Sequence, residues 1–285
     1  MSSRRKFIRQ SATAMGAIAV MGNLSTFLSS CTGKKPLSFG FQTWTLRDQL
    51  GEDLPGTLKM MAEKGYKEVE FCSPLGYKGT PFEKFNSMSG KELRKIIEDS
   101  GLKCPSSHYN MGELREHLEN RIEWSHEMGI NQIIASSFWL PKDASVDDYR
   151  NACNELNEIG MKIKDAGLQC GFHNHHMEFE KRGNELIYDA MLEELDPELV
   201  KMQFQVAVVN IGYHAADYFR KYPGRFFSAH LADWSEEKQS QVPIDQGIVD
   251  WDDFFEAAKI GGVKNFFVEM APKTFDASAE FLKTL

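Results

Sequence analysis

The chain has 285 residues and carries 33 lysines and arginines against 41 aspartates and glutamates, a formal net charge of −8. This acidic balance disfavours binding to nucleic acid or to anionic lipid, because both require basic surface patches. Hydrophobic residues make up 42% of the chain, and the length suits one large domain with a substantial core.

The first thirty residues have the pattern of an export signal rather than of a folded segment. The pair Arg4-Arg5 precedes an uncharged apolar stretch from Ala12 to Leu28, which resembles a twin-arginine signal peptide. Glycine, serine and threonine interrupt this stretch, so it makes a weak membrane span. Removal of residues 1–30 takes away four cations and no acid, which leaves 29 basic against 41 acidic residues and a net charge of −12.

The end of this stretch matches a bacterial lipobox, Leu28-Ser29-Ser30-Cys31, in which the cysteine is lipidated and becomes the new N-terminus. We expect a cleaved signal over residues 1–30 and a linker over residues 31–36. A signal anchor with an incidental cysteine is the alternative. The protein is predicted to lie outside the cytoplasm, in the periplasm or cell envelope, and to meet a membrane only through a lipid anchor at Cys31.

The remaining cysteines form no Cys-x-x-Cys pair, and most lie in or beside apolar, strand-like runs. We interpret them as buried free thiols, although an oxidising compartment would allow some of them to pair. They are Cys72, Cys104, Cys153 and Cys170.

From residue 37 onward, short apolar runs alternate with longer amphipathic ones. The expected strands are Leu37–Gln42, Glu68–Phe71, Lys103–Tyr109, Gln132–Ser136, Leu168–His173, Met202–Val206, Phe226–Leu231 and Asn265–Glu269. The expected helices are Leu54–Lys64, Lys91–Ser100, Gly112–Met128, Val146–Ala166, Asn184–Leu195, His214–Tyr222, Trp251–Ile260 and Ala277–Leu285. Several helices are expected to end at a glycine, namely Gly65, Gly101, Gly129, Gly167 and Gly261.

This alternation predicts an α/β fold, a (β/α)8 TIM barrel formed as a single domain by residues 37–285. A doubly wound open sheet is the alternative. It would place a glycine-rich phosphate turn after an early strand, and the sequence has neither a G-x-G-x-x-G nor a Walker pattern.

Polar side chains end most of the expected strands, and in such barrels the active site lies at the C-terminal ends of the strands. Buried strands that end in histidine or glutamate are costly unless those groups are paired or coordinated. The strand-end candidates are Gln42, Trp44, Glu70, His108, His173, His175, Gln205, His230, Asp233 and Glu269.

Several phrases of the sequence resemble the xylose-isomerase-like barrel superfamily, which contains sugar phosphate isomerases and epimerases. They are Phe39-Gly40-Phe41-Gln42, Val69-Glu70-Phe71, Phe172-His173-Asn174-His175, Tyr222-Pro223-Gly224-Arg225, His230-Leu231-Ala232-Asp233, Gly247-Ile248-Val249-Asp250-Trp251 and Phe267-Val268-Glu269. The resemblance covers nearly the whole chain after the signal.

The resemblance implies a divalent metal held by Glu, Asp, His and Glu at the ends of strands five to eight. His173 stands where the first glutamate is expected, while His230 and Glu269 match the histidine and the last glutamate. Ala207 stands where the aspartate is expected, and Gln205 offers a carbonyl oxygen two residues earlier. Two imidazoles, a carboxylate and an amide suit Zn, Mn, Co or Ni better than Mg.

The chemistry that the resemblance implies is proton abstraction next to the carbonyl of a sugar, with the metal as Lewis acid. Glu269 is the first choice for the base, with His173, His175 or Glu178 as the second proton carrier. Residues expected to bind substrate are Gln42, Trp44, Glu70, His108, Trp139 and Asp233. No cluster of arginine and lysine joins these strand ends, which favours a non-phosphorylated keto-sugar or glycoside.

Three other functions compete with isomerisation. The same intermediate gives elimination when a leaving group is present, as in a lyase or hydratase acting on 3-keto-glycosides. A lipoprotein that binds carbohydrate without catalysis is compatible with the missing aspartate. A metal nuclease of the abasic-site type is disfavoured by the charge of −12 and by the predicted export.

Overall fold

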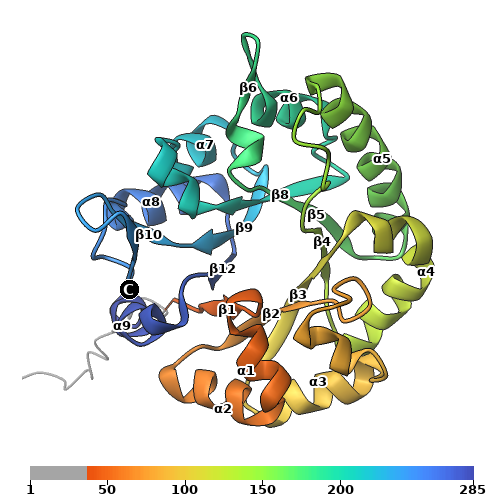
Figure 1. Ribbon diagram of the computed structural model, residues 1–285, viewed down its shortest axis with the longest axis vertical. Helices are drawn as coiled ribbons and strands as arrows, with labels where there is room; N and C mark the ends of the chain where they lie inside the picture. The colour runs from red at the N-terminus through yellow and green to blue at the C-terminus, as the bar shows by residue number, and fades with distance from the viewer. Residues whose placement is uncertain (1–36) are drawn as a thin grey trace, which may run out of the picture. The chain divides into compact units, whose positions relative to one another are not determined.

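The computed structural model describes residues 37–285, so the predicted signal peptide and Cys31 lie outside the described residues. Eight parallel strands close into a barrel in which each strand pairs with the next along the chain and the last pairs with the first (Figure 1). They are β1 (Gly40–Gln42), β2 (Glu68–Cys72), β3 (Lys103–Tyr109), β4 (Gln132–Ala135), β5 (Gln169–His173), β8 (Val200–Gln205), β9 (Phe226–Leu231) and β12 (Asn265–Val268).

Helices surround these strands (Figure 1), which confirms the predicted (β/α)8 TIM barrel. They are α1 (Arg47–Glu52), α2 (Leu54–Lys64), α3 (Gly90–Asp99), α4 (Met111–Met128), α5 (Val146–Asp165), α6 (Ile187–Glu194), α7 (Ala215–Lys221), α8 (Trp251–Gly261) and α9 (Phe275–Leu282). Within residues 37–285, none of the helices has the length and apolar character needed to cross a membrane.

Several expected helix boundaries differ from the structure by one to three residues, and two of these differences have a clear structural reason. The helix expected from Asn184 begins at Ile187, because residues 181–186 form a small antiparallel hairpin, β6 (Lys181–Arg182) with β7 (Glu185–Leu186). The left-handed residue that ends α8 is Gly262, with φ of 78°, whereas Gly261 is the last helical residue. Gly261 permits close packing of α8 against α7, because a Cβ at Gly261 would lie 3.0 Å from the Cβ of Phe219.

The first strand is packed too tightly for a side chain at Gly40. A Cβ at this position would lie 2.7 Å from the carbonyl oxygen of Glu68 and 2.7 Å from the ring of Phe267. Gly40 pairs in register with both of these residues, one on each neighbouring strand. The glycine therefore allows β1 to close the barrel between β2 and β12.

The phrase Tyr222-Pro223-Gly224-Arg225 has a structural role. The Arg225 guanidinium is buried and donates from Nη2 to the carbonyl oxygen of Leu195, at 2.6 Å, just after α6 ends. Hydrogen bonding of helix-terminal carbonyls by a basic side chain compensates for their missing intrahelical donors. Arg225 thus fixes α6 to the start of β9.

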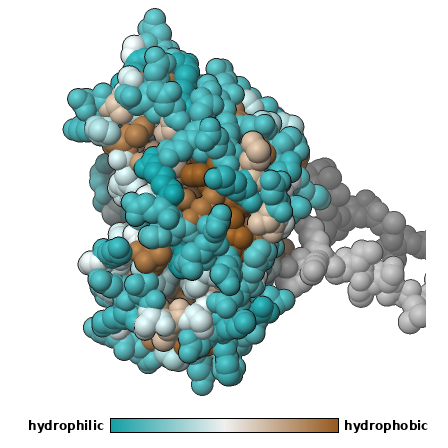
Figure 2. Space-filling model, turned by 90° about the vertical axis from the view of Figure 1, so that its right-hand side faces the viewer, coloured by the Kyte–Doolittle hydropathy of each residue, from teal (hydrophilic) through white to brown (hydrophobic). Residues whose placement is uncertain are grey.

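The side of the molecule shown in Figure 2 is mostly hydrophilic. Figure 2 shows the side on which α4 and α5 lie, where apolar side chains gather near the centre and polar ones surround them. The four cysteines of residues 37–285 are buried and free, in agreement with the expectation of thiols rather than disulfides.

Candidate active site

A cavity of about 400 Å³ opens where the barrel strands end. Seven of the residues predicted for the site line it, and they come from segments far apart in the sequence. They are Gln42, Trp44, His108, Trp139, His173, His175 and Glu269.

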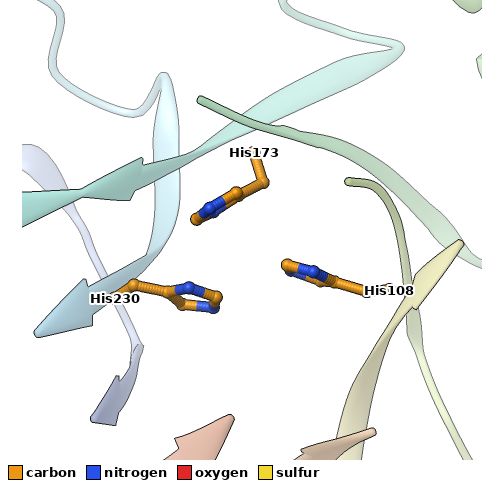
Figure 3. Close-up of side chains that lie close together, drawn as sticks. All are labelled: His108, His173 and His230. Carbon is orange, nitrogen blue, oxygen red and sulfur yellow. The ribbon is translucent and has the colours of Figure 1, made fainter. Parts of the chain in front are cut away.

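Three imidazoles converge beside this cavity, from the ends of β3, β5 and β9 (Figure 3). Each of His108, His173 and His230 places one ring nitrogen within 4.8 Å of one ring nitrogen of the other two. The rings of His108 and His230 are stacked with centroids 5.2 Å apart, and those of His173 and His230 are 4.4 Å apart. We call these three residues the imidazole cluster.

The imidazole cluster fits a divalent metal ion. His173 is buried, and its Nδ1 has no hydrogen-bond partner, so one polar atom of the ring is left unsatisfied. Burial and the neighbouring histidines hold the pKa of His173 well below its usual range, which keeps the ring neutral. Neutral imidazole is the form that binds zinc and similar ions.

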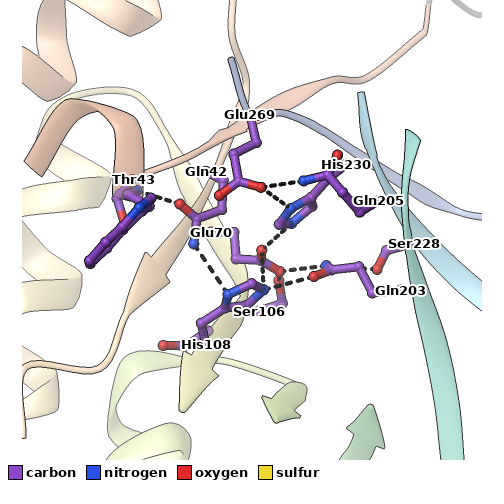
Figure 4. A network of polar contacts seen from close by, with 12 residues as sticks. Gln42, Thr43, Glu70, Ser106, His108, Gln203, Gln205, Ser228, His230 and Glu269 are labelled. Atoms are coloured by element: carbon purple, nitrogen blue, oxygen red, sulfur yellow. Dashed lines mark hydrogen bonds and ion pairs between the residues drawn. The ribbon is translucent and has the colours of Figure 1, made fainter. Parts of the chain in front are cut away.

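Glu70 contacts both His108 and His230 (Figure 4) and is not among the residues that line the cavity. Its side chain is fully buried and accepts hydrogen bonds from both His108 and His230. Burial opposes ionisation of Glu70, but the two imidazoles outweigh this and lower the pKa of the carboxyl well below its usual range. The prediction that Glu70 binds substrate hydroxyls was therefore wrong.

Glu269 follows β12 and faces the cavity, with its Oε2 atom 2.9 Å from Nδ1 of His230. Burial opposes a charge on either group. Their attraction prevails, and it lowers the pKa of Glu269 and, together with Glu70, raises the pKa of His230 to about 9. His230 therefore carries hydrogen on both ring nitrogens near neutral pH, with Nδ1–H facing Glu269, and binding of a metal ion at Nδ1 would release this proton.

Gln205 reaches the site, but its oxygen does not. The side-chain Oε1 accepts the backbone N–H of Ala207 at 3.2 Å, while Nε2 donates to Glu269 at 2.6 Å. The prediction that Gln205 offers a carbonyl oxygen to the metal is contradicted by this orientation. Gln205 pairs with His230 at the end of β8, and Ala207 lies beyond the strand in the 3-10 helix η4 (Val206–Ile211). The strand-end position that faces the site is thus occupied by glutamine.

His175 and Glu178 have different surroundings. The ring of His175 lines the cavity, perpendicular to that of His173 with centroids 4.8 Å apart, and burial lowers its pKa to about 4. Glu178 is buried behind this segment, where its Oε2 accepts the backbone N–H of His175 at 2.6 Å. Glu178 therefore fixes the backbone of the segment that follows β5 at His175. The prediction that Glu178 carries a proton to substrate was wrong.

Two tryptophans stand at the rim of the cavity. Trp139 is 64% exposed and has a φ of 52°, a left-handed conformation that is uncommon for a residue other than glycine. Trp44 is 36% exposed and packs beside Tyr77, with Arg47 4.5 Å from its ring centroid. Trp139 thus presents the more open aromatic surface.

Asp233 is buried and does not line the cavity. Its two oxygens accept four backbone N–H groups, from Trp234, Asp245, Gly247 and Val249, and the indole N–H of Trp251. These donors use the acceptor capacity of the carboxylate. The prediction that Asp233 binds substrate was wrong, because this carboxylate organises the segment between β9 and α8.

Comparison with known proteins identifies the family. Residues 58–285 match the family described as xylose isomerase-like TIM barrel. The chain belongs to this family. No curated protein matches the chain.

Solved structures share the fold at low identity. A sugar phosphate isomerase/epimerase from Parabacteroides distasonis is 22% identical, with a TM-score of 0.73 over 89% of this chain and 98% of that one. A probable 3-DHS dehydratase from Bacillus anthracis is 13% identical, with a TM-score of 0.67 over 86% and 98% of the two chains. A D-psicose 3-epimerase is 14% identical, with a TM-score of 0.60 over 86% and 96%.

The sequence reasoning missed how His108 and Gln203 enter the site. His108 was expected to contact substrate, yet it completes the imidazole cluster, and Gln203 links it to Glu70. The signal was present in the alternation of the strand, because Gln203 precedes Gln205 by two residues and so faces the same side.

Proposed function

We propose that this chain is a metal-dependent enzyme of the isomerase or epimerase type. It would act by proton abstraction next to the carbonyl of a non-phosphorylated keto-sugar or glycoside. The observation that carries this proposal is the imidazole cluster, of which His108 and His173, together with Glu269, line a cavity of about 400 Å³. Pockets for small ligands have this order of size.

The metal would be held by the three histidines of the imidazole cluster, with Glu269 beside them. A divalent ion there would supply Lewis-acid polarisation of a carbonyl oxygen. A donor set dominated by imidazole favours Zn, Co, Ni or Mn over Mg. The identity of the ion is left to the experiment below.

The chain's own residues supply the proton transfer. Glu269 faces the cavity and is ionised near neutral pH, since His230 lowers its pKa, so it is suited to accept a proton from carbon. The neutral ring of His175 lines the same cavity and is the second proton carrier. Gln205 orients Glu269 through its amide at 2.6 Å.

The composition of the cavity supports a substrate without phosphate. Lys78 is the one lysine or arginine among the residues that line it, whereas binding of a phosphate commonly uses several cationic or backbone donors. Trp139 offers an exposed indole at the rim, on which the apolar face of a sugar ring can stack. We also propose, from the sequence alone, that the enzyme works outside the cytoplasm on a lipid anchor at Cys31.

A second candidate is a lyase or hydratase that eliminates a group from a 3-keto-glycoside. The feature that favours it is the pair of proton carriers at one cavity, Glu269 and His175. After Glu269 removes the proton, the neutral ring of His175 can relay a proton to the departing oxygen, by accepting a proton from solvent at one nitrogen as the other nitrogen donates. Release of the aglycone would distinguish this reaction from isomerisation.

The test uses purified residues 32–285, an assay of bound metal, and a panel of aldoses, ketoses and 3-keto-glycosides. We expect bound divalent metal and turnover in the parent protein, and loss of both in His230→Ala. His126→Ala, an exposed histidine on α4, is the matched control and should behave as the parent. Tight sugar binding without turnover would show instead a carbohydrate-binding protein.

A further inference from the structure

Glu70 is a charged side chain at the centre of the barrel with an exposure of 0%. Each of its oxygens accepts two hydrogen bonds. Oε1 accepts from the hydroxyl of Ser106 and from Nε2 of Gln203 at 2.8 Å. Oε2 lies 2.9 Å from Nε2 of His108 and 2.5 Å from Nε2 of His230.

These contacts fix which ring nitrogens carry hydrogen. An ionised carboxylate only accepts, so the nitrogens that face Oε2 must both be Nε2–H donors. The amide of Gln203 is fixed in turn, because its Nε2 also contacts Ser228 at 2.9 Å and its oxygen faces Nε2 of His108 at 2.7 Å. Both imidazoles are therefore held with hydrogen on Nε2.

The opposite nitrogens point to groups that line the cavity. Nδ1 of His230 lies 2.9 Å from Glu269, and Nδ1 of His108 lies 3.4 Å from the amide nitrogen of Gln42. The amide of Gln42 is a donor at that contact, which agrees with an Nδ1 lone pair on His108. One carboxylate on β2 thus turns the Nδ1 atoms of two histidines, from β3 and β9, toward the cavity.

We propose that Glu70 is a positioning residue, which fixes His108 and His230 as Nε2–H tautomers and so presents Nδ1 of each to a metal ion. Carboxylates that accept the second N–H of a ligating histidine set the orientation and basicity of that ligand. Here a single carboxylate serves two histidines. This inference rests on the proposed metal-dependent function.

The experiment compares Glu70→Gln with the parent protein in titrations with Zn²⁺ and Co²⁺ against a competing chelator. The amide must place an NH₂ group at one of two positions. At the position of Oε2 it opposes both Nε2–H donors, and at the position of Oε1 it opposes Nε2 of Gln203 and so disturbs the amide that faces His108. We expect metal affinity to fall roughly 10- to 100-fold. Glu68→Gln is the matched control, because Glu68 lies on the same strand but contacts Ser38 and Asn265, and its affinity should be unchanged.

A spectroscopic measurement distinguishes a role of Glu70 in positioning the two histidines from a role in the stability of the fold. The Co²⁺-loaded parent should show exchangeable, paramagnetically shifted N–H proton signals from the Nε2–H groups of His108 and His230. Glu70→Gln should lose or displace at least one of them while circular dichroism stays unchanged. Glu70→Asp keeps the negative charge, so its affinity for the metal should be higher than that of Glu70→Gln.

The outcomes are distinguishable. Unchanged affinity and signals in Glu70→Gln would overturn the positioning role. Complete loss of metal binding in a folded variant would also overturn it, because Glu70 would then be a ligand. If the parent itself binds no metal, the proposed function and this inference both fail, whereas normal metal binding by both proteins refutes the inference alone.

Discussion

Glu113 provides a prediction about stability that can be worked from the structure. This α4 carboxyl is buried under the segment that carries the rim of the cavity, with Oε1 2.5 Å from the hydroxyl of Ser73 and 3.4 Å from Nη1 of Arg121. Burial raises the pKa of the carboxyl from 4.5 to about 7, against the opposing effects of Ser73 and Arg121. The folded protein therefore binds this proton more tightly than the unfolded chain does.

The raised pKa of Glu113 makes the free energy of unfolding depend on pH. Below about pH 4.5 both states are protonated, and Glu113 makes no difference to the pH dependence. Between about pH 4.5 and pH 7 the unfolded chain has released the proton while the folded state retains it, so the free energy of unfolding falls as pH rises. The difference between the two pKa values corresponds to about 3 kcal/mol, reached above pH 7.

The assay is urea unfolding of the parent and of Glu113→Gln from pH 4.5 to pH 8, with Glu116→Gln on the exposed side of α4 as control. Glutamine does not titrate, so the free energy of unfolding of Glu113→Gln relative to the parent should rise by about 3 kcal/mol across this interval. Loss of the contact with Arg121 changes the free energy of unfolding of Glu113→Gln by an amount that does not depend on pH between pH 4.5 and pH 8. A difference that stays constant within about 0.5 kcal/mol would refute the reasoning.

Three further substitutions test other parts of the account. Trp139→Ala should raise KM for a sugar substrate roughly 5- to 10-fold with a smaller change in kcat, because an aromatic stacking contact contributes about 1 kcal/mol. An unchanged KM in steady-state kinetics would show that the indole does not bind the substrate. Gly40→Ala should lower the free energy of unfolding by at least about 2 kcal/mol in urea titrations, because its Cβ would overlap Glu68 and Phe267. Asp233→Ala should speed amide hydrogen exchange throughout residues 245–249, and exchange at the parent rate would show that this carboxylate does not hold the segment.

Most of the barrel could be predicted because each strand is buried on both faces. Short strand-like runs between amphipathic segments predicted the ranges 103–109 and 226–231 with the bounds that the structure shows. The helix after β5 was misplaced because residues 181–186 continue its polar pattern but pair as a hairpin. Local periodicity does not show such pairing, which depends on contacts formed only in the fold.

The site could be predicted only as far as strand ends. Alternation placed His173, His230 and Glu269 at the mouth, and they do meet there. Periodicity cannot reveal which oxygen of a carboxylate is already used by neighbours. For that reason Glu70 and Asp233 were expected to bind substrate, whereas the surrounding donors occupy both.

The central claim is that the imidazole cluster binds a divalent ion at the floor of the cavity. The most direct measurement is an anomalous difference map from crystals of residues 32–285 grown with zinc. We expect one strong peak at coordination distance, about 2.0–2.1 Å, from nitrogens of His173 and His230. A map without a peak beside these two histidines, or with peaks only at the outer surface, would contradict it.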